Sequence, residues 1–161
     1  MHGEKKPALR SLFHQNFEGK QRMASILDTT KERDAHIDRR LRNDIIVWLN
    51  TVRPDGRAHA VAVWFLWDGE SFLIFSQPHT QKIRNLQHNT NVLLAVDDTH
   101  KGADPITIEG IARLLAPGEV DTANPAYIEK YGEAIKQIGF TPEQMAAEYS
   151  QPIRITPTRV L

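Results

Sequence analysis

Polar and basic side chains gather in one short stretch between two apolar segments. Ser76, Gln77 and Thr80 supply hydroxyl and amide groups, and Lys82 and Arg84 follow with fixed positive charges. Such groups in one loop suit a phosphate, and a helix beginning after Thr80 would add free backbone N–H groups. The stretch is a candidate anion-binding site. The alternative is that Thr80 only caps a helix and that both cations are solvated.

The segments on either side predict how this loop is held. Residues 71–76 are short, apolar and rich in β-forming residues, which is typical of a strand, and Pro78 ends it. Ile83 and Leu86 form an i,i+3 apolar pair, so a short helix is expected after the loop. Residues 92–96 then predict the next strand.

The segments before the loop read as paired strands. Residues 44–52 predict a strand, and the apolar run over 45–49 within it indicates burial on both faces. A turn at 53–57 leads to a long strand over 58–67, and a hairpin turn at 68–70 leads on to 71–76. We therefore expect a three-stranded antiparallel meander.

One face of the 58–67 strand carries small side chains. Ala58, Ala60 and Ala62 alternate along it and leave space in which a flat ring could lie against the backbone. The alternative is that these alanines pack under a helix.

The second half of the chain completes a mainly β fold with short helices. Residues 105–116 predict a strand with a bulge at Gly110, and 152–161 a last strand in which Pro157 marks an edge or an exit. Helices are expected over 32–42, from Pro125, and from Pro142. In the helix from Pro125, the apolar face would comprise Ile128, Tyr131, Ile135 and Ile138. About six strands joined by hairpins predict an antiparallel barrel over 31–161, preceded by a partly mobile extension over 1–30.

Composition excludes several classes of protein. The chain has 161 residues, enough for one domain, and 20 basic residues balance 20 acidic ones, so no net charge draws it to nucleic acid or membranes. It has no cysteine, hence no disulfide and no thiolate ligand or nucleophile. No secretory signal or apolar span is evident, so a cytoplasmic protein is expected.

The sequence contains none of the common motifs that carry their own chemistry. The chain lacks the glycine-rich dinucleotide fingerprint, the P-loop, the zinc-protease motif and the serine nucleophile elbow. No metal site is expected and no catalytic side chain can be named. If the protein is an enzyme, a cofactor carries the reaction and the protein positions it.

Three segments together resemble a known family. They are Trp48-Leu49-Asn50-Thr51-Val52-Arg53-Pro54-Asp55-Gly56-Arg57, Val63-Trp64-Phe65-Leu66-Trp67-Asp68-Gly69 and Ser76-Gln77-Pro78-His79-Thr80-Gln81-Lys82-Ile83-Arg84-Asn85-Leu86. They resemble the pyridoxamine 5′-phosphate oxidase-like split β-barrel superfamily and, more narrowly, its F420-dependent branch of flavin/deazaflavin oxidoreductases. The resemblance runs from about Ile37 to the end of the chain.

The resemblance implies a six-stranded antiparallel split barrel of the FMN-binding type. It also implies a homodimer with two cofactors in grooves between the subunits. By position, the cofactor phosphate would be held by Ser76, Gln77, Thr80 and Lys82. The ring system would lie against Val61, Ala62, Val63 and Trp64. Arg154 and Arg159 are weaker candidates for reaching the partner's cofactor. The anionic tail of F420 needs a basic groove, and charge alone predicts that Arg53, Arg57 and Arg84 line it; the alternative is that these arginines are solvated.

The details of the loop bear on which cofactor is bound. Vitamin B6 oxidases of the superfamily carry Ser-Arg-Lys where this chain has Thr80-Gln81-Lys82, one positive charge fewer. FMN has a phosphate monoester of almost two charges and F420 a diester of one, so the weaker charge favours F420. The C-terminal segment that binds pyridoxal phosphate has no match here, so vitamin B6 oxidation is not expected.

The expected function is therefore hydride transfer from reduced F420 to a small organic acceptor. Two alternatives remain open from the sequence. One is an FMN-binding flavin reductase or a relative of pyridoxamine phosphate oxidase. The other is a non-enzymatic binder of a flavin or tetrapyrrole. The expected partners are a small-molecule substrate and a second copy of the chain.

Overall fold

The computed structural model describes residues 25–97 and 101–161, so most of the predicted N-terminal extension lies outside it. The elements are, in chain order, α2 (Glu32–Asn43), β1 (Ile46–Val52), β2 (Ala58–Trp64), β3 (Leu66–Trp67), β4 (Phe72–Ser76), α3 (Gln81–Leu86), β5 (Asn91–Val96), β6 (Ile106–Leu114), α4 (Pro125–Gln137), α5 (Pro142–Glu148) and β7 (Gln151–Val160). Among the described residues, no helix combines the length and apolar character needed to cross a membrane.

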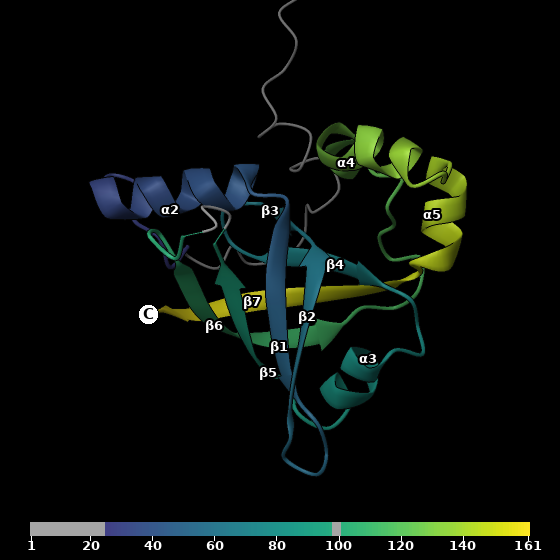
Figure 1. Cartoon of the computed structure of the whole chain (residues 1–161), viewed down its shortest axis with the longest axis horizontal. Coiled ribbons are helices and arrows are strands. Elements are labelled where there is room, and N and C mark those ends of the chain that lie inside the picture. Colours follow the sequence, from purple (N-terminus) through teal and green to yellow (C-terminus); the bar gives the residue numbers. More distant parts are fainter. Residues whose placement is uncertain (1–24, 98–100) are drawn as a thin grey trace, which may run out of the picture.

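The strands form one antiparallel sheet that curls on itself (Figure 1). Its order is β2-β1-β5-β6-β7-β4-β3, which gives seven strands, so the predicted count of six is wrong. The extra strand arises because the predicted strand 58–67 is two strands at opposite edges of the sheet. β2 pairs with β1, whereas β3 pairs with β4. Both predicted hairpins form, but they lie at opposite edges of the sheet and do not make one three-stranded meander.

Phe65 is the residue at which the chain passes from one edge of the sheet to the other. Its backbone leaves the β1 ladder after the Ile46–Trp64 pair, and side chains of α4 satisfy the freed groups. The Tyr131 hydroxyl accepts from the N–H of Phe65 at 2.9 Å and shares its proton between the carbonyls of Ile45 and Phe65, at 2.7 and 2.8 Å. The sheet is thus closed through the chain at Phe65.

A second side chain of α4 holds the same carbonyl. The Lys130 ammonium donates to the Phe65 oxygen at 3.1 Å and lies 4.1 Å from the centre of the Phe65 ring. Burial lowers the pKa of Lys130 from 10.5 to about 8, against an opposing contribution from Asp44. Lys130 and Tyr131 together fix the strand crossing.

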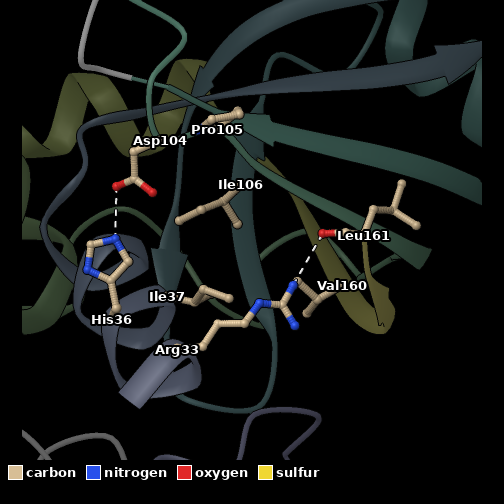
Figure 2. A pocket seen from close by; sticks show the side chains of 8 residues that line it. All are labelled: Arg33, His36, Ile37, Asp104, Pro105, Ile106, Val160 and Leu161. Carbon is tan, nitrogen blue, oxygen red and sulfur yellow. Dashed lines mark hydrogen bonds and ion pairs between the residues drawn. The ribbon is translucent and has the colours of Figure 1, made fainter. Parts of the chain in front are cut away.

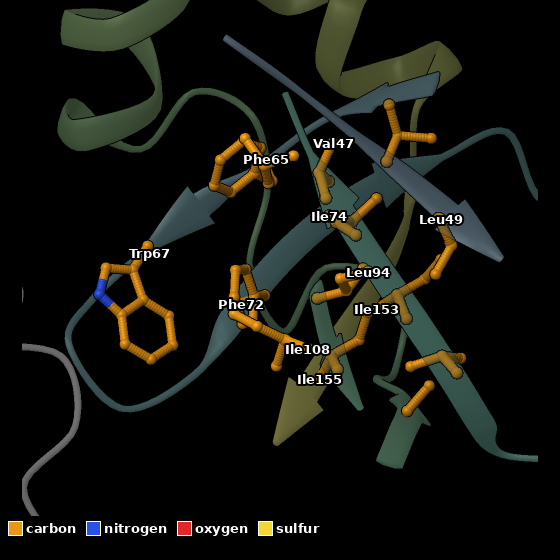
Figure 3. Close-up of a cluster of buried hydrophobic side chains, with 14 of the residues drawn as sticks. Val47, Leu49, Phe65, Trp67, Phe72, Ile74, Leu94, Ile108, Ile153 and Ile155 are labelled. Atoms are coloured by element: carbon orange, nitrogen blue, oxygen red, sulfur yellow. The ribbon is translucent and has the colours of Figure 1, made fainter. Parts of the chain in front are cut away.

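Two apolar cores lie on the two faces of the curled sheet. The inner core fills the barrel, where Val47, Leu49, Leu94 and Ile153 meet Phe72 (Figure 3). Helices α2 and α3 lie at opposite ends of the barrel and contribute to this core. The outer core packs α4 and α5 against the far side of β4 and β3, and its buried members are Leu66, Leu73, Phe75, Leu115, Tyr127, Tyr131, Ile135 and Met145.

β1 is buried on one face only, so the prediction of burial on both faces is wrong. Val47 and Leu49 point inward, whereas Ile46 and Trp48 are 43% and 49% exposed. The reason is that α4 and α5 cover the other half of the sheet, which leaves the outside of β1, β2, β5 and β6 open. We call this the outer face; it is lined by Ile46, Trp48, Ala62, Leu93 and Ile111.

The helices predicted from Pro125 and Pro142 are confirmed. The Asn124 side chain accepts from the N–H of Tyr127 at 2.9 Å, and Thr141 and Gln144 form a capping box. The predicted apolar face of α4 is partly wrong, because Tyr127 is buried and Ile138, beyond the last turn, is exposed.

The bulge predicted at Gly110 is confirmed. The β6–β7 register shifts between Glu109 and Gly110, and a Cβ at Gly110 would meet the Thr156 carbonyl oxygen at 2.9 Å. Gly110 pairs with Pro157, which lies beyond the last β4–β7 pair at Ile155. Pro157 therefore has an unpaired edge on one side, as expected.

Replacement of Tyr131 by Phe should lower the free energy of unfolding by about 2–3 kcal/mol. The change leaves the Phe65 N–H and the Ile45 carbonyl without the hydroxyl that satisfies them. Tyr127→Phe is the matched control, since no hydrogen bond to the Tyr127 hydroxyl is present in the described chain. Urea denaturation measures both, and equal effects of the two substitutions would contradict the role given to Tyr131.

Lys130 should make stability depend on pH in a defined direction. Between its folded pKa of about 8 and its ordinary value of 10.5, the unfolded chain binds more protons, so stability rises with pH in that window. Relative to Lys130→Met, the wild type should gain stability from pH 7 to pH 10. Urea denaturation of both proteins at several pH values tests this, and a constant difference would contradict it.

Candidate functional site

The loop after β4 is shaped by its own hydroxyl groups. Ser76 is buried, and its hydroxyl donates to the Gln77 carbonyl at 2.9 Å and lies 3.1 Å from the Thr80 hydroxyl. Thr80 is at the predicted N-cap position, but its side chain does not cap the helix. Because α3 has only six residues, the case for an anion site here rests on side chains and not on a helix dipole.

Lys82 is the cation of this loop. Its side chain is half-buried, and burial lowers its pKa. In the part of the chain that the structure describes, no carboxylate forms an ion pair with it. A partly desolvated cation without a counter-ion is unfavourable, and an anion placed beside it would remove that cost.

Two residues predicted to bind the cofactor, Gln77 at the phosphate and Arg84 in the basic groove, already have partners within the chain. The Gln77 side-chain amide donates to Glu148 of α5 at 2.5 Å, which places a carboxylate beside the loop. Arg84 folds back over the loop, where it donates to the His79 carbonyl at 2.7 Å and to the Gln81 side-chain oxygen at 2.9 Å. Arg84 therefore stabilises the loop from within the same subunit.

The residues predicted to meet the ring alternate between the two faces of β2. Val61 and Val63 pack against the inner core, and Ala62 is exposed on the outer face. Trp64 stacks on Tyr131, with ring centres 4.7 Å apart and planes 6° from parallel.

β2 is an edge strand, and it comes into contact with β4 without pairing to it. We call the unpaired boundary between β2 and β4 the seam. The chain closes it at Phe65, where β2 passes into β3, and β4 ends beside it at Ser76. The backbone edge of β2 and the Ser76–Lys82 loop therefore border the same seam, and the charge of Lys82 acts on His59 of β2.

The other predicted arginines are spread over the subunit. Arg57 pairs with Asp55 at 2.7 Å in the exposed β1–β2 turn. Arg154 lies three register positions from the Ser76–Gln151 pair and donates to the Ser71 hydroxyl at 3.4 Å. Arg159 is exposed, in register with Glu109. Among the described residues, no hydrogen bond or ion pair joins Arg57 or Arg159 to the loop.

A buried polar chain beside the loop was not predicted from the sequence. Thr51 of β1 and Asn85 of α3 are 2% and 0% exposed, and the Asn85 amide donates to the Thr51 hydroxyl at 2.8 Å. Thr51 is the cross-strand partner of His59 on β2. The turn at 53–57 predicts that Thr51 pairs with His59, and the i,i+4 spacing predicts that Gln81 lies beside Asn85. These two parts of the polar chain could therefore have been found from the sequence.

A small hollow lies at the α2 end of the barrel (Figure 2). It has a volume of about 110 Å³, and His36 contacts Asp104 across it at 2.8 Å. Ligand pockets typically exceed about 300 Å³, so this hollow does not suit a flavin-sized cofactor. In the described residues, no group of three or more histidine, aspartate or glutamate side chains could hold a metal.

The curled sheet, closed through the chain at Phe65 and open between β2 and β4, defines a split β-barrel. A sequence model of the pyridoxamine 5′-phosphate oxidase family matches residues 34–161, and the chain belongs to that family. The family resemblance inferred from the sequence is thereby confirmed. A search of curated proteins found no match.

Solved structures similar to this chain include proteins of different described roles. An F420 reductase is 25% identical, with a TM-score of 0.61, over 77% of this chain and 94% of its own. A pyridoxamine 5′-phosphate oxidase-like protein from Listeria innocua is 22% identical, with a TM-score of 0.61, over 81% and 97%. HutZ, described as the heme storage protein of Vibrio cholerae, is 16% identical, with a TM-score of 0.54, over 81% and 92%.

Proposed function

We propose that the protein is an oxidoreductase that uses reduced coenzyme F420 to transfer a hydride to a small organic acceptor. The observation that carries the proposal is the half-buried Lys82, which has no carboxylate partner in the described chain and lies in the loop after β4. Such a cation is a binding element for the phosphate of a cofactor. The cofactor would supply the redox chemistry, and the protein would bind and orient it.

The charge around the loop favours a phosphate diester over a monoester. Lys82 is the single basic residue of the Thr80-Gln81-Lys82 triplet, and Glu148 contributes a carboxylate beside Gln77. A nearby negative charge disfavours a group of almost two charges more than a group of one. This supports F420 over FMN, and so does the similarity to an F420 reductase at 25% identity.

The ring system of the cofactor would lie along the open edge of β2. An edge strand offers backbone N–H and C=O groups that no neighbouring strand uses. Ala62 adds little bulk on the exposed side, so a flat ring can approach the backbone closely. The ring and its phosphate would then occupy the seam and the loop at its end.

We further propose that the outer face pairs with the outer face of a second copy. Ile46, Trp48 and Ile111 are each more than 40% exposed there, and exposed apolar residues gathered on one sheet face mark an interaction surface. Small exposed residues of β2 border this face, so a partner subunit would also border the seam. Arg154 and Arg159 could then act on the partner's cofactor, as the family resemblance implies.

A second candidate function is non-enzymatic binding of a tetrapyrrole. It is favoured by the likeness of the fold to HutZ, described as a heme storage protein. The edge of β2 that we propose for the flat ring of F420 would also accept a porphyrin, because a porphyrin is flat. The two candidates differ in their anionic groups, because heme has no phosphate and carries two carboxylates.

Binding of F420, FMN and heme to the purified protein, followed by fluorescence or absorbance, tests the proposal. We expect micromolar binding of F420, with weaker binding of FMN and of heme. Lys82→Met should weaken F420 binding about 10- to 100-fold, the equivalent of about 1.5–3 kcal/mol for a charged hydrogen bond. Lys136→Met, at an exposed lysine of α4, is the matched control.

Other outcomes of the binding experiment would support a different function or contradict the site. Preference for FMN would identify a flavin-dependent enzyme. Tight heme binding that Lys82→Met leaves intact would favour the storage role. Unchanged F420 affinity in Lys82→Met would contradict the assigned phosphate site.

Trp48→Lys should convert the dimer to a monomer. A charge at the centre of the outer face would be desolvated without a partner in the proposed interface. Ile138→Lys, at an equally exposed apolar residue beyond α4, should leave the dimer intact. Sedimentation at micromolar concentration distinguishes the two, and a monomeric wild type would refute the interface.

A further inference from the structure

A chain of five side chains runs from the loop to the edge strand β2. Arg84 donates to the Gln81 side-chain oxygen at 2.9 Å, and the Gln81 amide donates to the Asn85 oxygen at 2.7 Å. The Asn85 amide then donates to the Thr51 hydroxyl at 2.8 Å, and that hydroxyl lies 3.5 Å from Nδ1 of His59. The chain links β1, β2 and α3 at the end of the barrel where the loop lies.

The directions of the first three bonds in this chain follow from its first member. A guanidinium can only donate, so the Gln81 oxygen faces Arg84 and its NH₂ group faces Asn85. The same reasoning turns the Asn85 NH₂ group toward Thr51. The Thr51 hydroxyl accepts that bond, and its own proton remains available for His59 Nδ1, 3.5 Å away.

His59 is thereby left with one defined donor. If Nδ1 accepts the available Thr51 proton, the proton of the neutral imidazole resides on Nε2. Burial lowers the pKa of His59, and the charges of Arg53 and Lys82 lower it further. The ring is therefore neutral at pH 7, with an N–H to offer beside two cations.

We propose that His59 is a neutral hydrogen-bond donor to the cofactor phosphate, and that the Arg84–Gln81–Asn85–Thr51 chain selects its donating nitrogen. The proposal rests on the function proposed above and adds a residue to its phosphate site. His59 would supply a hydrogen bond and Lys82 the charge. A neutral donor suits a diester, because it adds directionality without the extra positive charge that a monoester requires.

Thr51→Val tests this, because valine has nearly the shape of threonine but no hydroxyl. It should weaken F420 binding about fivefold or more, and the conservative Thr51→Ser should restore affinity to within about twofold of the wild type. Nitrogen NMR of the imidazole rings reports the tautomer without any ligand. His59→Gln identifies the His59 signals, which should show the Nε2–H form in the wild type and a mixture in Thr51→Val.

The outcomes separate this inference from the proposed function. If the wild type binds F420 but Thr51→Val binds it equally well, or if His59 is charged or in the Nδ1–H form at pH 7.5, the inference is overturned. If the wild type binds no cofactor, the proposed function fails. Titration with inorganic phosphate then tests separately whether His59 donates to a phosphate. A phosphate-dependent shift of the His59 signals would support the donor role, and no shift would refute it.

Discussion

The hydrogen bonds from Tyr131 and Lys130 to the backbone of Phe65 hold together a sheet whose two edges meet at that residue. β2 lies at one edge and β3 at the other, although only Phe65 separates them in the chain. A backbone that leaves a ladder in an apolar interior needs new partners, and α4 provides them. The rest of the barrel follows from this crossing, because it decides which strands pair and where the sheet stays open.

The opening and the proposed site are consequences of the same crossing. β4 starts beside β3 and ends at Ser76, so the loop that follows lies at the open end of the seam. The edge of β2 faces that seam because its continuation has moved to β3. A barrel closed by regular pairing of β2 with β4 would leave no such unpaired edge.

Much of this architecture could be predicted from the sequence, and the predictions that were wrong failed for physical reasons. Turn residues and capping residues act locally, so the hairpins and the starts of α4 and α5 were predictable. The break at Phe65 was not, because no glycine, proline or polar residue marks it and its partners come from Tyr131 and Lys130, more than 60 residues away. The exposure of Ile46 and Trp48 was also hidden, since an apolar run does not tell which faces other elements cover.

Some residues of the candidate site could likewise be predicted from the sequence, and others could not. The loop from Ser76 to Lys82 could be recognised because its groups are adjacent in sequence. The placement of Arg84 could not, because the acceptors it finds depend on how the loop folds. His59, Thr51 and Asn85 come from three elements, and only the cross-strand register and the packing of α3 bring them together.

β4 belongs to both cores, and all five of its residues are buried. The inner core contacts Phe72 and Ile74 from one side, and the outer core contacts Leu73 and Phe75 from the other. The barrel and its two covering helices therefore share one wall and cannot melt as separate cooperative units. The loop that begins at Ser76 is attached directly to this wall, so its geometry persists for as long as the whole domain remains folded.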